Sequence, residues 1–142
     1  MLGPRGRLNL TNRWLQMTGW KRPAGVSEWV LLVVFRLPGR LSLLPWDPDG
    51  PRVEMRYKEL AAADPPDEEG MRRIVDRYNR LPVPIDRRCS LGEPALTHLG
   101  LVGSTQEHPV WIAAFPNRID ILAPRLRDAE LVAGAAVFDD LP

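Results

Sequence analysis

The sequence predicts an α+β fold: a single antiparallel sheet of about five strands, with two or three helices packed on one face. Three observations predict this class. An apolar, β-branched run covers residues 29–35, a strongly amphipathic helical pattern covers residues 67–81, and a pair of short strands follows at residues 110–123. The expected order of elements is α-βββ-α-ββ-α, and residues 1–142 are expected to form a single domain.

The amino-terminal segment is expected to start as an arm and continue as a helix. Residues 1–7 are rich in glycine, proline and arginine, which predicts a loose basic arm. Over residues 8–18, apolar side chains recur at helical spacing, and Gly19 is placed to end the helix. The apolar face of this expected helix consists of Leu10, Trp14 and Met17.

Three strands are expected next, joined as an antiparallel meander. Residues 29–35 are apolar on both faces and predict a central strand covered on both sides. Pro38-Gly39 predicts a tight turn into a second strand at residues 40–46, and residues 47–51 predict another turn. Apolar and charged residues alternate over residues 52–58, which predicts a half-exposed third strand.

A long amphipathic helix is expected to follow. Asp67 is placed to cap it, and Glu68 and Glu69 suit the positive end of its dipole. Its apolar positions repeat at i, i+3, i+4, i+7 and i+10: Met71, Ile74, Val75, Tyr78 and Leu81. These side chains are expected to pack against the central strand in one continuous interior.

The remainder alternates irregular and regular segments. Residues 82–94 contain three prolines and predict an irregular, extended connection, followed by a short helical turn after Pro94. Residues 110–115 and 118–123 predict a hairpin, with Ile119 and Ile121 inward and Arg118 and Asp120 outward. A last helix is expected to begin at residue 125 and run toward residue 138.

Composition excludes several classes of protein. The net charge is +1, but residues 1–45 hold seven arginine and lysine residues against Glu28 alone. Such an asymmetry is compatible with a basic arm for nucleic acid and with internal attraction between the two parts of the fold. The longest apolar run has seven residues, whereas a membrane helix needs about 20. A lone cysteine, Cys89, excludes an internal disulfide and favours a cytoplasmic protein.

No chemical motif is complete. The weak catalytic candidates are Cys89, His98 and His108, because a thiolate beside Arg87 and Arg88 would be activated and a histidine could serve as its base. Their spacing matches no zinc motif, and an ordinary loop cysteine with two surface histidines is the simpler interpretation. Residues 47–50 lack the remaining acids of a calcium loop, and residues 100–105 lack the lysine of a phosphate-binding loop. We therefore expect no metal and no cofactor.

The expected function is that of a non-enzymatic accessory or assembly module that binds another protein or itself. The expected interface buries Trp20 and part of residues 82–94 and includes an open sheet edge. Tryptophan and arginine are enriched at interfaces, and Trp20 is the aromatic that a core explains least. The predicted partner-binding residues are Trp20, Arg13, Lys21, Arg22, Pro82, Pro84, Arg87 and Arg88.

Two alternatives remain open. One is a nucleic-acid-binding accessory that uses the basic, tryptophan-containing front of the chain. Its phosphate contacts would be Arg5, Arg7, Arg13, Lys21 and Arg22. The other is a small cysteine-dependent enzyme built on Cys89.

Overall fold

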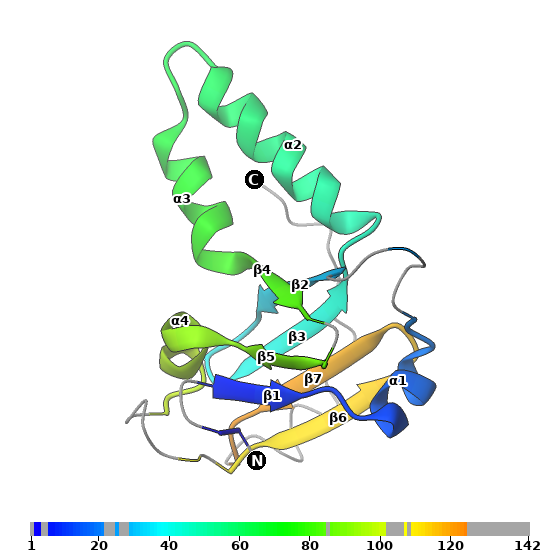
Figure 1. The fold of residues 1–142 in the computed structure, drawn as a ribbon. Helices are drawn as coiled ribbons and strands as arrows, with labels where there is room; N and C mark the ends of the chain where they lie inside the picture. The colour runs from blue at the N-terminus through cyan, green and yellow to red at the C-terminus, as the bar shows by residue number, and fades with distance from the viewer. Residues whose placement is uncertain are drawn as a thin grey trace.

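The computed structural model describes residues 2–3, 6–21, 25, 29–84, 86–101, 107 and 109–124. These residues form an α+β fold with two antiparallel sheets (Figure 1). In chain order the elements are β1 (Arg7–Asn9), α1 (Asn12–Thr18), β2 (Trp29–Phe35), β3 (Arg40–Pro45), α2 (Asp49–Ala62), α3 (Glu68–Arg77), β4 (Tyr78–Val83), β5 (Arg88–Ser90), α4 (Gly92–His98), β6 (Trp111–Phe115) and β7 (Arg118–Leu122).

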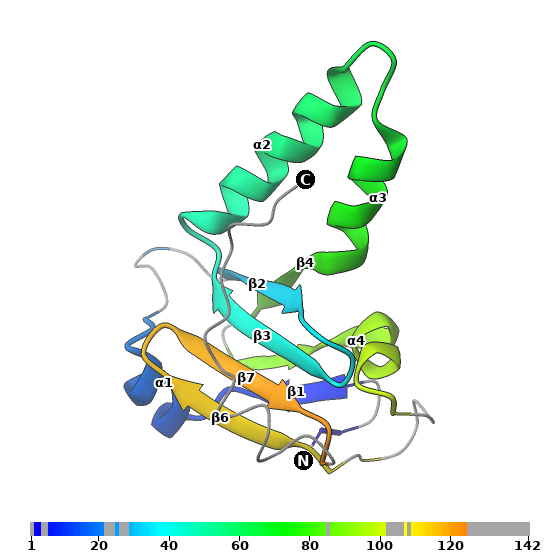
Figure 2. The ribbon, with the colours of Figure 1, turned by 180° about the vertical axis from the view of Figure 1, so that it is seen from behind.

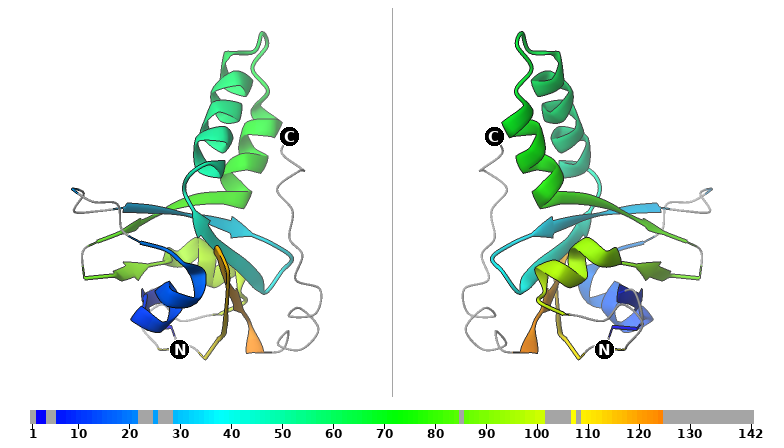
Figure 3. Two further views of the ribbon diagram at one scale, coloured as in Figure 1. Left: turned by 90° about the vertical axis from the view of Figure 1, so that its right-hand side faces the viewer. Right: turned by 90° about the vertical axis from the view of Figure 1, so that its left-hand side faces the viewer.

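The larger sheet has five strands in the order β4-β2-β3-β7-β6, and every neighbouring pair is antiparallel. The predicted strand at 29–35 is confirmed as β2, which lies between two neighbours. Both predicted hairpins are present: β2–β3 turns at Gly39, which has φ 88°, and β6–β7 turns at Asn117, which has φ 60°. The sheet is strongly twisted, so β6 and β7 cross the direction of β2 and β4 (Figure 3).

The prediction of a single sheet with two or three helices on one face is wrong, since the described residues form four helices and two sheets. A second, two-stranded sheet pairs β1 with β5, and helices lie on both faces of the larger sheet. The α2–α3 hairpin stands on one face, while α1, α4 and the small sheet lie on the other (Figures 2 and 3). The two faces therefore enclose two separate apolar clusters.

Strand β2 divides its side chains between these clusters. Leu31 and Val33 belong to the large core under α1, α4 and the small sheet, whereas Leu32 and Val34 face the helical hairpin. The expected contact between this strand and the amphipathic helix exists on the hairpin side, through Ile74 and Tyr78. The cluster on the hairpin side is the smaller of the two, and Val75 of the same predicted stripe is 54% exposed.

The predicted third strand at 52–58 is wrong, because these residues lie inside α2. On a helix the apolar residues of the alternating pattern separate: Val53 is buried in the hairpin core, while Met55 and Tyr57 are exposed. Leu60, seven residues after Val53, completes the buried face.

The helix predicted over 67–81 is shorter than expected. Asp67 caps it as predicted, since its Oδ1 accepts a hydrogen bond from the Gly70 N–H at 2.9 Å. The helix α3 ends at Arg77, and Tyr78–Val83 form the edge strand β4. The irregular connection predicted over 82–94 is likewise wrong in part, because it contains the end of β4, all of β5 and the start of α4.

The first predicted helix is also shorter, since Leu10 precedes it and α1 starts at Asn12. Gly19 ends it as expected, with φ 78°. Leu10 is fully buried, but Met17 is half exposed. The helix expected from residue 125 lies outside the described residues.

The outward placement predicted for Arg118 and Asp120 is wrong. Asp120 is 1% exposed, and its carboxylate accepts hydrogen bonds from Arg40 Nη2 at 2.8 Å and Ser42 Oγ at 2.7 Å. Arg118 Nε forms an ion pair with it at 3.1 Å. Burial lowers the pKa of nearby Arg36 to about 10, against the opposing effect of Asp120. A buried network of charged side chains therefore lies on the face of β3 and β7 that is turned away from the large core.

Candidate functional site

The outer edge of β6 is the first candidate site. The strand has the sequence Trp-Ile-Ala-Ala-Phe, without proline or charge, and it ends the five-stranded sheet. Among the residues that the structure describes, no strand pairs with its outer side. Natural edge strands are usually protected by charge, proline or a bulge, so an apolar, unprotected edge is a candidate for pairing with another chain.

The register fixes which backbone groups face outward. Phe115 pairs with Arg118 across the two-residue turn, and alternate residues of an antiparallel strand direct their N–H and C=O groups to opposite sides. Phe115, Ala113 and Trp111 therefore face β7. The N–H and C=O groups of Ile112 and Ala114 face away from it, toward the outer edge.

A groove of about 570 Å³ runs beside this edge. One wall is α1, with Arg13, Trp14 and Met17, and the other is the stretch of β6 from residue 112 to 115. Helix α1 is held against the hairpin of β6 and β7 by a backbone hydrogen bond from Asn117 N–H to the Thr18 carbonyl, at 3.0 Å. The lining of the groove is partly apolar and partly polar, and its one cation, Arg13, is exposed.

The structure divides the predicted partner-binding residues between separate places. Arg13 lines the groove, and Arg87 lies close to it, because its guanidinium donates a hydrogen bond to the Asn12 side chain. Pro82 is exposed on β4, at the other end of the five-stranded sheet. The remaining members are Lys21, Pro84 and Arg88, which are described, and Arg22, which lies outside the described residues.

Trp20 is not available to a partner. Its side chain is 6% exposed and belongs to the large core. The sequence neighbours Gly19 and Lys21 suggest a surface position, but the chain leaves α1 through the left-handed Gly19 and turns Trp20 inward. The residues that sequence reasoning did not select are Trp14, Met17 and those of β6; the apolar strand pattern was visible, but its place at the edge was not.

The two described catalytic candidates, Cys89 and His98, are engaged in contacts within the fold. Cys89 is buried in β5, and its thiol donates a hydrogen bond to the Leu8 carbonyl at 3.4 Å. Burial, together with the smaller effect of the Asp86 charge, raises the pKa of Cys89 to about 11, so the thiol is protonated at neutral pH. The Nε2 of His98 donates to the Arg40 carbonyl at 2.7 Å, and its ring stacks on Phe35.

His108 lies outside the described residues. Within the described ranges, no group of three or more His, Cys, Asp or Glu side chains could hold a metal ion. None of the described helices has the length and apolar character needed to cross a bilayer.

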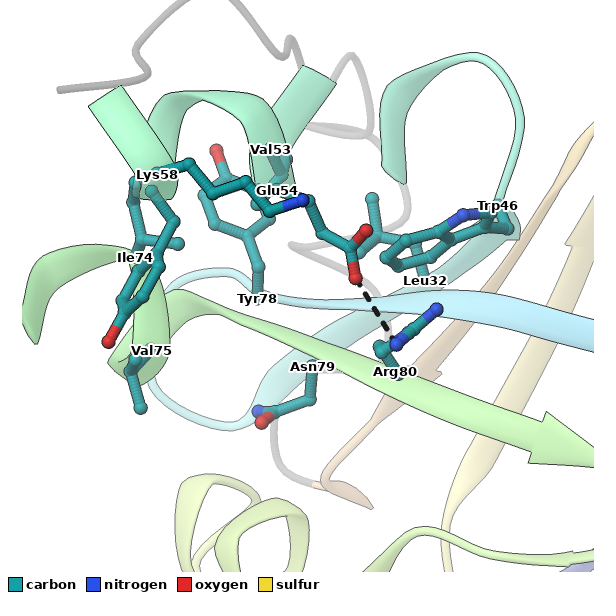
Figure 4. A pocket seen from close by; sticks show the side chains of 11 residues that line it. Leu32, Trp46, Val53, Glu54, Lys58, Ile74, Val75, Tyr78, Asn79 and Arg80 are labelled. Atoms are coloured by element: carbon teal, nitrogen blue, oxygen red, sulfur yellow. Dashed lines mark ion pairs between the residues drawn. The ribbon is translucent and has the colours of Figure 1, made fainter. Parts of the chain in front are cut away.

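A second hollow lies between the helical hairpin and the larger sheet. It has a volume of about 650 Å³ and is lined by residues of α2, α3, β2 and β4, with Trp46 (Figure 4). It is separate from the groove beside β6, since the two share no lining residue.

The chain matches no model of a known protein family, no curated protein and no solved structure. Its function is therefore inferred from these surfaces.

Proposed function

We propose that this chain is a non-enzymatic interaction module that binds an extended segment of a partner protein along the outer edge of β6. The observation behind the proposal is the apolar edge strand Trp111–Phe115, whose outward backbone groups at Ile112 and Ala114 lie beside the groove of α1. A bound strand would supply backbone hydrogen bonds at the edge and apolar side chains for the groove.

Charge favours a different protein over a second copy of this chain. Arg13 is exposed in the groove and forms no ion pair with a described residue. Two copies joined edge to edge would each bring an Arg13 to the shared seam, where like charges repel. A partner strand with an acidic side chain beside its apolar residues would instead complement this cation. We therefore assign the site to an apolar, singly acidic β-strand.

The proposal is tested with a library of displayed 12-residue peptides selected against the folded protein. The selected peptides should have apolar residues at every second position and should include an acidic residue. Their affinity for the protein is then measured by fluorescence anisotropy. Ala114→Pro removes one outward N–H but leaves the pairing with β7 intact, as prolines on edge strands do. It should weaken binding about tenfold or more, because a lost backbone contact leaves the partner carbonyl unpaired.

Arg13→Glu should weaken binding of the acidic peptides and leave neutral ones nearly unchanged. Arg73→Glu, an exposed charge on α3, is the matched control and should have no effect. Peptides that bind Ala114→Pro as well as the unaltered chain would refute the proposal. If the protein formed a dimer that dissociated in the Ala114→Pro variant, the proposal would also be refuted, because the edge of β6 would then bind a second copy of this chain.

The two alternatives receive less support. Of the cations expected to contact phosphate, Arg7, Arg13 and Lys21 are exposed, whereas Arg5 and Arg22 lie outside the described residues. Trp20, a proposed stacking platform, is buried, however. A cysteine-dependent enzyme needs a thiolate, which the raised pKa of Cys89 disfavours.

A further inference from the structure

We propose that the hollow under the helical hairpin binds a small carboxylic acid with an apolar body. This site is independent of the β6 edge. It lies on the opposite face from α1, between the hairpin and strands β2 and β4 (Figures 3 and 4).

The floor of the hollow is apolar and firmly held. Leu32, Val53 and Ile74 are each less than 5% exposed and belong to the hairpin core. The Trp46 ring forms one side, fixed from outside by the Arg80 guanidinium 4.7 Å from its centroid. A volume of about 650 Å³ falls within the range of about 300–1,000 Å³ typical of small-molecule sites. An aromatic or short aliphatic body therefore fits between the hairpin and the sheet.

The mouth is polar, and its charges are unequal. Glu54 of α2 and Arg80 of β4 form an ion pair at 3.2 Å across the opening. Lys58 extends from α2 over the same opening (Figure 4) and forms no ion pair with a described residue. Asn79 lines the rim from β4 and adds an amide. Two cations against one acid leave one positive charge in excess.

This arrangement selects the ligand class. A single carboxylate at the mouth would neutralise the excess charge by pairing with Lys58, while Glu54 keeps its own pair with Arg80. A second carboxylate would meet Glu54 without a further cation, so a monoanion fits better than a dianion. The apolar body would displace water from Leu32, Val53 and Trp46, which supplies the driving force.

The test uses 2-naphthoate and its neutral analogue 2-naphthalenemethanol as probes. The chain has five tryptophans, so the indole N–H region of a ¹H–¹⁵N spectrum is simple, and Trp46→Phe assigns the Trp46 resonance. Titration with naphthoate should shift this resonance saturably, and the alcohol should bind more weakly. The absence of a Trp46 shift, or shifts at unrelated positions only, would overturn the proposal.

Lys58→Met should weaken naphthoate about fivefold, as expected for a partly exposed charge pair, and leave the alcohol unchanged. The chain has only one other lysine, Lys21, so Lys21→Met is a matched control and should behave as the unaltered protein. Equal preference for the carboxylate with and without Lys58 would refute its role. Val75→Trp, at a half-exposed lining position, should fill the hollow without stressing the core and abolish binding of both probes.

Discussion

Asp120 shows how one buried charge is held by its neighbours along the sheet. It lies opposite Ser42 in the β3–β7 register, so the two side chains lie on the same face, and Ser42 Oγ donates to it at 2.7 Å. Arg40 lies two positions before Ser42 on the same face of β3 and reaches the Asp120 carboxylate from there. Removing a carboxylate from water costs several kcal/mol, and only such complete pairing offsets this cost.

Asp120→Asn should therefore lower the free energy of unfolding strongly, by about 3 kcal/mol, because Arg40 is left buried without its counter-ion. The comparison is Glu59→Gln, which breaks the exposed Arg56–Glu59 pair and should cost less than about 1 kcal/mol. Urea unfolding followed by circular dichroism measures both. Equal, small effects for the two variants would show that the network contributes little.

The sequence does not distinguish these two acids. In the segment 118–122 the charged and apolar residues alternate, and the ordinary interpretation places the charged ones in water. The partners of Asp120 lie about eighty residues away, at Arg40 and Ser42, and no local pattern connects them. Trp20 fails for a related reason, since its burial depends on the direction in which Gly19 sends the chain.

At the scale of elements, local sequence patterns predict the hairpins well but do not reliably distinguish a strand from a helix. The β2–β3 and β6–β7 hairpins follow from apolar runs joined by tight turns, and both are present. Residues 52–58 match a strand pattern, but they continue into Glu59-Leu60-Ala61-Ala62, which are good helix formers. Extending the window by one turn would have favoured the helix.

The sequence pattern does not reveal strand β4, because the helical pattern of α3 continues into it. The helical spacing of α3 continues formally through Tyr78 and Leu81, and Pro82 argues against a strand. Proline is tolerated here because β4 is an edge strand. Edge positions follow from strand order, which sequence alone leaves open. For the same reason neither the position of β6 at the end of the sheet nor the hollow under the hairpin could be predicted.

The first turn of α2 depends on a glycine. Gly50 lies against the Trp46 ring, and a Cβ at this position would overlap the ring atoms. Gly50→Ala should therefore destabilise the protein by about 1–3 kcal/mol, although the same change at an open helical position is stabilising. Trp46 would move away from Arg80, which near-ultraviolet circular dichroism detects. An unchanged tryptophan signal with raised stability would contradict this packing.

At the scale of the whole molecule, the larger sheet lies between two cores, and its strands contribute side chains to both of them. Consecutive residues of β2 enter different cores, Leu31 and Val33 on one side and Leu32 and Val34 on the other. Strand β4 does the same, with Tyr78 in the hairpin core and Leu81 in the large core. Neither core can lose its strand without exposing the apolar side chains of the other.

This sharing predicts a single cooperative unfolding transition. Ile74→Ala in the hairpin core and Leu43→Ala in the large core should each lower the free energy of unfolding by about 2–4 kcal/mol, because both side chains are buried. In each variant the helical signal in the far ultraviolet and the tryptophan fluorescence should change at the same urea concentration. Val75→Ala, at an exposed position of the same helix, should shift neither curve by more than about 0.5 kcal/mol. If Ile74→Ala lost its helical signal at lower urea than its fluorescence, the hairpin would unfold separately and the two cores would be energetically independent.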